Sequence, residues 1–332
     1  MKFLVVGLGS MGKRRIRNLQ HLGVTTIAGF DPREDRRSEA EKKYCIPIFD
    51  SFQSALSDFG PSALIISTPP SLHTYYIKCA LDININCFIE ASVTDTSEIY
   101  SLSLLASAKD LIVAPSCTMK YYPGPAKVKE LLFSGNYGRP LSFTYYSGQY
   151  LPDWHPWEDI QDFYVSERQT GGCREIVPFE LTWLNDLFGH PKVLSSCKTK
   201  LSDMSADIDD IYQINLLYPG RVLGSLIVDV LSRPEARREM FINLEQGQIV
   251  YSAHEQVVRS IHAKDKTWNT FALESGTIEN QYINPEEPYI RELQDFINAC
   301  LAANQNRFPN TLLRDWSILD LLDRIDEVAT SF

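Results

Sequence analysis

Five short runs that are apolar at almost every position recur through the first 118 residues, with helix-length segments between them. They cover residues 3–7, 26–31, 63–68, 86–90 and 111–116. A strand that is apolar on both sides has to be covered on both sides, which is typical of a parallel sheet with helices on each face. The alternation therefore predicts a doubly wound α/β domain in this part of the chain.

A glycine-rich segment, GLGSMG at residues 7–12, joins the first run to a helix-like segment, and Asp31 ends the second run. Gly7 suits a tight turn, Gly9 the close approach of a pyrophosphate and Gly12 the packing of helix on strand, while Asp31 can accept hydrogen bonds from a ribose. This combination predicts a dinucleotide-binding Rossmann domain. The candidate cofactor-binding residues here are Gly7, Gly9, Ser10, Met11, Gly12, Asp31 and Arg33.

The charges around this turn bear on the choice of dinucleotide. A carboxylate at Asp31 repels a 2′-phosphate and favours NAD, whereas the nearby Arg33 could tolerate NADP. We expect the basic side chains after the turn to form a solvated helix face; they are Lys13, Arg14, Arg15 and Arg17.

Beyond residue 120 the apolar pattern changes from continuous to alternating, which indicates an antiparallel sheet with one exposed face. The strand-like segments are 141–150, 210–218, 221–232, 238–245, 247–252 and 256–262, with hairpin joints at 219–220 and 246–247. Helical segments follow at 288–305 and 313–329. We expect two domains, a dinucleotide-binding domain over 1–120 and an α+β domain for substrate binding and oligomerisation over 121–332, with the last helices able to pack back on the first.

The composition favours a small-molecule partner. A net charge of −10 opposes long-range attraction to DNA, and no apolar run approaches the roughly 20 residues of a membrane span. The apolar start of the chain breaks into glycines too early for a signal peptide, so we expect a cytoplasmic protein. The 7 cysteines are scattered without a CxxC pair, which argues against disulfides and a structural metal.

The strand at 221–232 carries more apolar residues than one covered face requires. Large exposed apolar surfaces usually mark interfaces, so we expect a homodimer or homotetramer joined through the exposed face of the sheet.

The third strand runs into STPPSLH, residues 67–73, and together with the glycine turn this segment resembles the Gfo/Idh/MocA oxidoreductases. The resemblance extends over the whole chain and implies a Rossmann domain followed by a domain with an open antiparallel sheet. It adds cofactor-binding candidates beyond the glycine turn, namely Thr68, Pro69, His73 and Glu90.

The chain departs from this family at the usual proton-transfer groups. Members usually carry Glu-Lys-Pro where this sequence has Glu90, Ala91 and Ser92. Many also have an aspartate and a histidine where an ungapped alignment places Ile176 and Phe179. Because alanine cannot carry a proton, hydride-transfer chemistry would need other side chains.

Two other side chains are candidates for proton transfer. Lys120 matches a region where the family often has an arginine, and it is equally consistent with a surface lysine or one that only binds substrate. His155 belongs to the segment GQYLPDWHPWED, residues 148–159, which is dense in groups that suit sugars. The alternative for this segment is a packed loop with core tryptophans and a structural histidine.

The candidate substrate-binding residues come from this loop and from the later segment GGCREIVPFE, which the resemblance places at the start of a helix that lines the substrate cleft. Arg174 could hold a carboxylate or phosphate with its planar fork, although a surface pair with Glu175 is the simpler alternative. The substrate-binding candidates are Tyr150, Asp153, Trp154, Trp157, Arg174 and Glu175.

Three functions fit these features. The first is an NAD(P)-dependent oxidoreductase acting on a sugar, cyclitol or nucleotide-sugar, with carbohydrate or cell-surface polysaccharide metabolism as its setting. The second is a dinucleotide-binding sensor or regulatory protein without redox activity. The third is a lyase or hydratase in which the nicotinamide cycles transiently. The glycine turn supports cofactor binding in all three, and the missing lysine weakens only the first.

Overall fold

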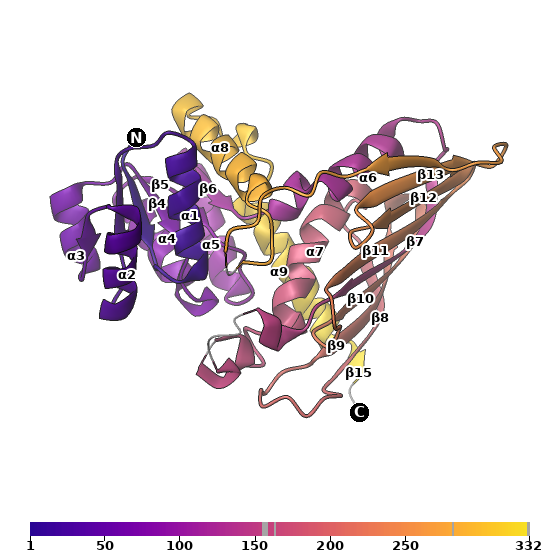
Figure 1. Cartoon of the computed structure of the whole chain (residues 1–332), viewed down its shortest axis with the longest axis horizontal. Helices are drawn as coiled ribbons and strands as arrows, with labels where there is room; N and C mark the ends of the chain where they lie inside the picture. Colours follow the sequence, from indigo (N-terminus) through magenta and orange to yellow (C-terminus); the bar gives the residue numbers. More distant parts are fainter. Residues whose placement is uncertain (155–158, 163, 281, 331–332) are drawn as a thin grey trace. The chain divides into compact units, whose positions relative to one another are not determined.

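The computed structural model describes residues 1–154, 159–162, 164–280 and 282–330. The chain forms two compact units. The first consists of Met1–Thr118, Thr277–Glu279 and Asn284–Ser317, and the second of Met119–Gly276, Asn280–Ile283 and Ile318–Phe332. Figure 1 colours both along the sequence.

The first unit is built on a parallel six-stranded sheet in the order β3-β2-β1-β4-β5-β6. The strands are β1 (Phe3–Val6), β2 (Ile27–Phe30), β3 (Ile48–Phe49), β4 (Ala63–Ile66), β5 (Asn86–Ile89) and β6 (Val113–Pro115). Every residue of β1, β2 and β4 is buried, as strands covered on both faces require. The predicted doubly wound α/β fold is confirmed.

The helices of this unit include one from near the end of the chain. They are α1 (Ser10–His21), α2 (Glu34–Tyr44), α3 (Phe52–Ser54), α4 (His73–Asp82), α5 (Thr96–Ala108) and α8 (Glu287–Ala302), with the first turns of α9 (Leu312–Glu327). The ring of Phe296 on α8 lies 6.5 Å from Phe3 and 5.8 Å from Phe88, so α8 covers β1 and β5.

The basic residues of α1 do not form the expected solvated face. Arg15 is fully buried, with ion pairs to Glu90 at 2.7 Å and to Glu292 at 3.0 Å. Arg14 is 2% exposed and pairs with Glu286 at 3.0 Å. Two further side chains of α1 also bind Glu286, namely Arg17 and Asn18. The prediction was wrong because the carboxylates that neutralise these cations come from distant parts of the chain.

The second unit is built on a nine-stranded sheet in the order β14-β13-β12-β11-β7-β10-β9-β8-β15. The strands are β7 (Pro140–Gly148), β8 (Lys192–Thr199), β9 (Ile211–Tyr218), β10 (Val222–Asp229), β11 (Arg237–Leu244), β12 (Gly247–Ser252), β13 (Val257–His262), β14 (Asn269–Ala272) and β15 (Ala329–Thr330). Only the pairs β7–β10 and β8–β15 are parallel, which confirms the mainly antiparallel sheet. The sequence pattern did not indicate β8, β14 or β15.

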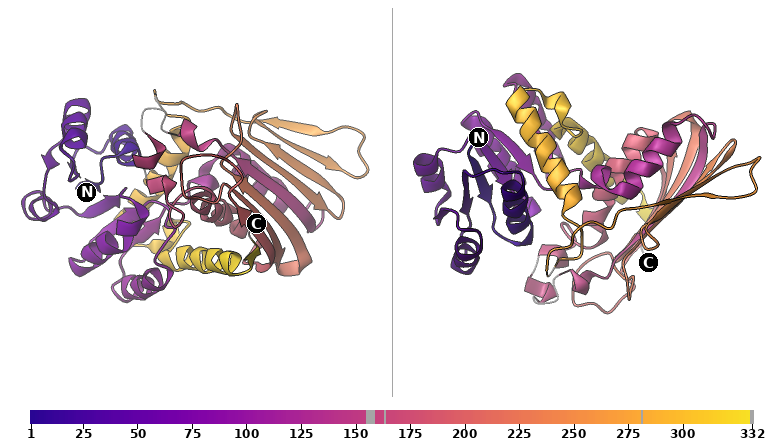
Figure 2. Two further views of the ribbon diagram at one scale, coloured as in Figure 1. Left: turned by 90° about the horizontal axis from the view of Figure 1, so that it is seen from below. Right: turned by 45° about the horizontal axis from the view of Figure 1, so that its top comes forward.

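Helices cover one face of this sheet, and none of the described helices lies on the other face (Figures 1 and 2). They are α6 (Pro123–Phe133), α7 (Cys173–Phe188) and the second part of α9, whose Ile318, Leu322 and Ile325 join the core. Burial alternates along β9, as expected for a strand with one covered face.

A buried carboxylate fixes α7 to the sheet. Glu180 is fully buried and accepts four hydrogen bonds, from Tyr145 at 2.8 Å, Ser147 at 2.8 Å, Trp183 at 2.9 Å and Arg238 at 2.9 Å. These bonds join the middle of α7 to β7 and β11.

Candidate active site

The glycine turn between β1 and α1 is shaped to receive a ligand at one position. Gly7 has φ +89°, and a Cβ there would lie 2.5 Å from the carbonyl oxygen of Ser67. A Cβ on Gly12 would lie 1.8 Å from the carbonyl oxygen of Gly7. At Gly9 a Cβ would meet only the guanidinium of Arg36, at 3.5 Å. Gly7 and Gly12 are therefore required by the fold, whereas the space beside Gly9 is open to a ligand. Ser10 and Met11 form the first turn of α1, whose N-terminal end attracts an anion.

Asp31 stands at the end of β2 with its carboxylate already engaged. It is 2% exposed and accepts from the main-chain N–H of Leu8 at 2.8 Å and of Arg33 at 2.9 Å. These bonds fix the glycine turn against the end of β2. The lone pairs that remain on its oxygens are those a ribose would use.

Arg33 at the N-cap of α2 and the two arginines in its first turns have different partners. Arg33 forms a surface pair with Asp35, whereas the guanidinium of Arg36 lies 3.8 Å from the carboxylate of Asp31. Arg37 donates to the carbonyl oxygens of Asp31 and Pro32. The structure thus brings Arg36, which sequence reasoning missed, to the glycine turn, and leaves Arg33 at the surface. The helical spacing from the N-terminus of α2 is the signal that could have distinguished them.

The loop after β4 is tied to the loop after β5 through His73. Its ring is 1% exposed; Nε2 lies 3.0 Å from the carbonyl oxygen of Thr68 and Nδ1 3.3 Å from Oγ of Ser92. Burial lowers the pKa of His73 to about 4, so the ring is neutral near neutral pH. The imidazole therefore holds two loops together. Pro69, in the loop after β4, is exposed. The hydroxyl of Thr68 in the same loop is buried and has no hydrogen-bond partner among the described residues.

The hydrogen bonds around His73 have a defined direction. The Thr68 carbonyl can only accept, so Nε2 carries the proton and Nδ1 accepts from the hydroxyl of Ser92. Ser92 also bonds the carboxyl group of Asp315 on α9. Burial raises the pKa of Asp315 to about 7, and the hydrogen bond with Ser92 opposes this shift.

Asp315 makes stability depend on pH. Its pKa is raised from the ordinary 3.8 to about 7, so folding favours the protonated carboxyl. The contribution of this group to the free energy of unfolding is therefore complete below about pH 4 and is lost as the pH rises through 7. We expect Asp315→Asn, whose amide can still donate to Ser92, to be more stable than the wild type at pH 8 by about 2–4 kcal/mol and nearly equal at pH 4. Urea denaturation at both pH values measures this. A difference that does not change with pH, or one also produced by Asp320→Asn on the same helix, would contradict it.

Glu90, which follows β5 and precedes Ala91, is bound by other protein groups. The carboxylate of Glu90 is bound by Arg15 at 2.7 and 2.8 Å and by the hydroxyl of Ser67 at 3.2 Å. Glu292 takes the other side of Arg15 and accepts from the main-chain N–H of Cys117 at 2.5 Å. Glu90 is therefore part of a buried charge cluster, and its carboxylate is occupied by protein groups.

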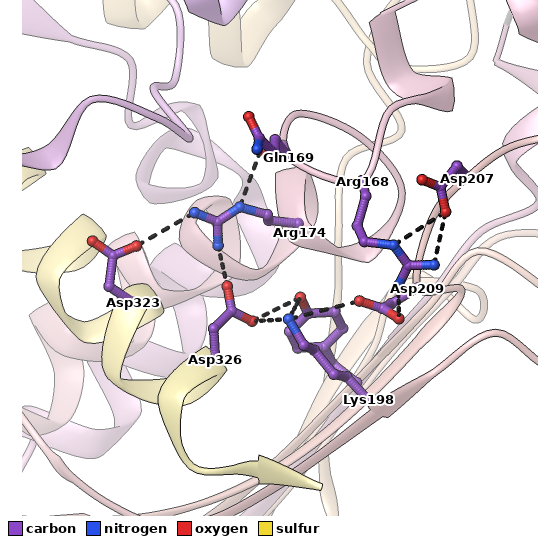
Figure 3. Close-up of polar contacts among 9 residues, drawn as sticks. Arg168, Gln169, Arg174, Lys198, Asp207, Asp209, Asp323 and Asp326 are labelled. Atoms are coloured by element: carbon purple, nitrogen blue, oxygen red, sulfur yellow. Dashed lines mark hydrogen bonds and ion pairs between the residues drawn. The ribbon is translucent and has the colours of Figure 1, made fainter. Parts of the chain in front are cut away.

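The guanidinium of Arg174, at the start of α7, is engaged by two carboxylates of the same unit. Its guanidinium contacts Asp326 and lies 3.4 Å from Asp323 on α9, and its Nε donates to the carbonyl oxygen of Gln169 (Figure 3). Substrate binding by Arg174 stays a prediction. The simpler pairing with Glu175 is not observed.

Arg174 is one end of a larger network of charges in the second unit. Figure 3 shows Lys198 between Asp326, at 2.7 Å, and Asp209, at 3.7 Å. Arg168 joins Asp209 at 2.6 Å to Asp207 at 2.8 Å. The network links the start of α7, β8 and the last turns of α9.

Glu175 keeps one oxygen uncommitted. Tyr164 donates to its Oε1 at 2.7 Å, and the buried Oε2 has no partner among the described residues. Burial raises the pKa of Glu175 to about 7, against the opposing hydrogen bond from Tyr164. Ile176 is buried and Phe179 packs against the core, so the neighbouring positions on α7 are apolar.

The remaining candidates differ in their surroundings. Lys120 lies 3.3 Å from the carboxylate of Asp186, which Lys129 also binds. Tyr150 has the guanidinium of Arg233 4.5 Å from its ring centre. Asp153 is exposed, whereas Trp154 packs against the core with its Nε1 buried and without a partner in the described part of the chain. His155 and Trp157 lie outside the described residues.

The described residues contain no group of three or more histidine, cysteine or acidic side chains placed to hold a metal ion. None of the helices within them is both long enough and apolar enough to cross a membrane.

A glycine turn at the start of a parallel sheet is typical of a dinucleotide-binding Rossmann domain. Residues 1–116 match the model of the oxidoreductase family with the NAD-binding Rossmann fold, and residues 126–250 match the Gfo/Idh/MocA C-terminal domain. The chain belongs to the Gfo/Idh/MocA family, which confirms the resemblance. No curated protein matches the sequence significantly.

Solved structures share this fold at low sequence identity. An oxidoreductase from Agrobacterium radiobacter, in complex with NAD+, L-tartaric acid and magnesium, is 13% identical with a TM-score of 0.85, covering 99% of this chain and 96% of its own. Levoglucosan dehydrogenase in complex with NADH is 15% identical with a TM-score of 0.84 and the same coverage. UDP-N-acetylglucosamine 3-dehydrogenase from Acidithiobacillus ferrooxidans is 17% identical with a TM-score of 0.77, covering 99% and 97%.

Proposed function

We propose that this protein is an NAD-dependent oxidoreductase that interconverts a hydroxyl and a carbonyl group on a sugar, cyclitol or nucleotide-sugar. The observation that carries the proposal is the open position beside Gly9, in a turn whose other glycines are required by the fold. The low-identity relatives that act on levoglucosan and on UDP-N-acetylglucosamine support a sugar-like substrate. When bound, NAD supplies the acceptor for a hydride.

The residues of the first unit fit this cofactor. The glycine turn and the start of α1 would hold the pyrophosphate, and Asp31 the adenosine ribose. The unpartnered hydroxyl of Thr68 is a buried polar atom that a ligand would satisfy.

Loss of the usual lysine leaves proton transfer to other groups, and Lys120 and His155 are the candidates that the sequence offers. A fall in turnover of about 10²-fold in Lys120→Met or in His155→Ala would assign the proton to that residue.

Arg36 would set the tolerance for NADP. Its guanidinium lies beside Asp31 and Gly9 and can pair with a 2′-phosphate. Arg33 is less suited to this role because its guanidinium is paired with Asp35. We expect NAD to bind more tightly than NADP, and Arg36→Ala to weaken NADP about tenfold while Arg33→Ala leaves both unchanged. Calorimetry with both cofactors measures this. Tighter binding of NADP than of NAD by the wild type would reverse the stated preference.

We also propose that two copies associate through the helix-free face of the nine-stranded sheet. Large apolar side chains are exposed there, including Leu223 at 47% and Phe241 at 53%. Covering them would favour association, by about 1.5–3 kcal/mol for each fully buried side chain. Light scattering should give a dimer or tetramer for the wild type and smaller species for Leu223→Glu and Phe241→Glu. A monomeric wild type at micromolar concentration would contradict the association.

The absence of the usual lysine supports a second function, an NAD-binding sensor without redox activity. A crystal grown with NAD and soaked with a panel of sugars and nucleotide-sugars separates the two. A sugar hydroxyl carbon beside nicotinamide C4 supports the enzyme. NAD bound with no sugar from the panel beside it favours the sensor.

A further inference from the structure

A single arginine of α1 connects the ends of neighbouring strands in the first unit. The guanidinium of Arg15 donates to both carboxylate oxygens of Glu90, which follows β5, at 2.7 and 2.8 Å. The same carboxylate accepts a hydrogen bond of 3.2 Å from the hydroxyl of Ser67, which follows β4. On its other side the guanidinium forms an ion pair of 3.0 Å with Glu292 of α8.

Glu292 extends these contacts to the next strand of the sheet. Its carboxylate accepts from the hydroxyls of Ser116 at 3.1 Å and Thr118 at 2.9 Å. It also accepts from the main-chain N–H of Cys117 at 2.5 Å. These three residues follow β6 directly. Arg15 and Glu292 therefore hold the segments after β4, β5 and β6 together at one edge of the sheet.

The orientation of Arg15 is fixed by its surroundings. The side chain is fully buried, and its guanidinium carbon lies 4.4 Å from the ring centre of Phe88 and 5.3 Å from that of Tyr289. A planar guanidinium can stack on a ring while it donates two parallel hydrogen bonds to one carboxylate, and a lysine ammonium cannot do both. Lysine at this position would keep the charge and lose the fixed geometry at Glu90.

This edge of the sheet adjoins the glycine turn. A Cβ on Gly7 would lie 2.5 Å from the carbonyl oxygen of Ser67, so the segment after β4 touches the turn. The next residue, Thr68, has a buried hydroxyl without a hydrogen-bond partner in the described part of the chain, which is typical of an atom that binds a ligand.

The strand order determines which half of a dinucleotide this edge would receive. In such a sheet the dinucleotide crosses the carboxyl ends of the strands, with one half on each side of the switch point between β1 and β4. Asp31, the candidate for the adenosine ribose, ends β2 on one side of that point. The half that carries the nicotinamide then falls to the ends of β4, β5 and β6.

We propose that Arg15 and Glu292 are positioning residues for the nicotinamide half of the cofactor; this inference rests on the NAD binding of the proposed function. They act through the segments after β4 and β5, which they hold in place from the interior of the unit. Their effect is confined to the part of the cofactor beyond the pyrophosphate, because Asp31 and the glycine turn are held by other contacts.

Calorimetry with NAD and with ADP, which lacks the nicotinamide and its ribose, tests this selectivity. We expect Arg15→Lys to weaken the binding of NAD about tenfold and to leave the affinity for ADP within about twofold of the wild type. Arg14→Lys is the matched control, because Arg14 is also buried on α1 but bonds Glu286 and Asn284, just before α8. It should lower the thermal stability to a similar degree and leave the ratio of the two affinities unchanged.

Two results would overturn the inference. One is an equal loss of affinity for NAD and ADP in Arg15→Lys, which would make Arg15 a purely structural residue. The other is the same change in the affinity ratio in Arg14→Lys.

Ser67→Ala decides the question if Arg15→Lys does not fold. It removes one donor to Glu90 and changes no charge, so it should weaken NAD about threefold and leave ADP unchanged. Unchanged affinity for NAD in this variant would exclude the positioning role. Because every readout is a binding constant, a wild type that binds NAD but oxidises no sugar would contradict the proposed function and leave this inference standing.

Discussion

Replacing Gly9 by valine is expected to lower the affinity for NAD at least about 100-fold while the protein stays folded. The reason is that a Cβ at this position would meet only the guanidinium of Arg36 among the described residues, and the rest of the side chain would fill the space that a pyrophosphate takes. Valine at the N-cap of α1 should cost about 1 kcal/mol of stability. Calorimetry measures the affinity and thermal unfolding the stability.

Gly12→Ala provides the contrast for this variant. Its Cβ would collide with the carbonyl oxygen of Gly7, so it should lose stability and NAD binding together. Unchanged NAD affinity in folded Gly9→Val would mean that the cofactor does not approach this turn.

Replacing Glu180 by leucine is expected to destabilise the protein by about 3–5 kcal/mol. The substitution leaves Arg238 buried without its carboxylate, and such an uncompensated charge dominates the cost. Three neutral donors lose their acceptor at the same time: Tyr145, Ser147 and Trp183. Urea denaturation measures the change in the free energy of unfolding.

The double variant Glu180→Leu with Arg238→Met separates charge from packing. It removes both members of the pair, so it should recover a large part of the stability lost in Glu180→Leu alone. If the two single losses simply add, the ion pair is not what connects α7 to β11.

The parts of the fold that were predicted are those fixed by local patterns. The continuous apolar runs identified β1, β2, β4, β5 and β6, and the alternating runs identified β7 and β9 to β13. The missed strand β8 has mixed polarity, because three of its eight residues are exposed next to the sheet edge. The strands β3 and β15 are two residues long, which is too short for a periodic signal.

The partners of the charged side chains could not be predicted from local sequence patterns. Arg14 was assigned to solvent because its neighbours in sequence are basic, but its partner Glu286 lies 272 residues away. The guanidinium of Arg174 likewise donates to Asp323 on α9, which lies 149 residues further along the chain. Burial of such charges depends on tertiary partners, and local periodicity carries no information about them.

The central claim, that this chain oxidises a sugar-like hydroxyl with NAD, is tested most directly by following NADH absorbance while the protein is supplied with NAD and a panel of sugars, cyclitols and nucleotide-sugars. The account predicts NADH formation with at least one of them, equal amounts of NADH and ketone, and no reaction by Gly9→Val. Tight binding of NAD by the wild type without NADH formation from any of these substrates would contradict it.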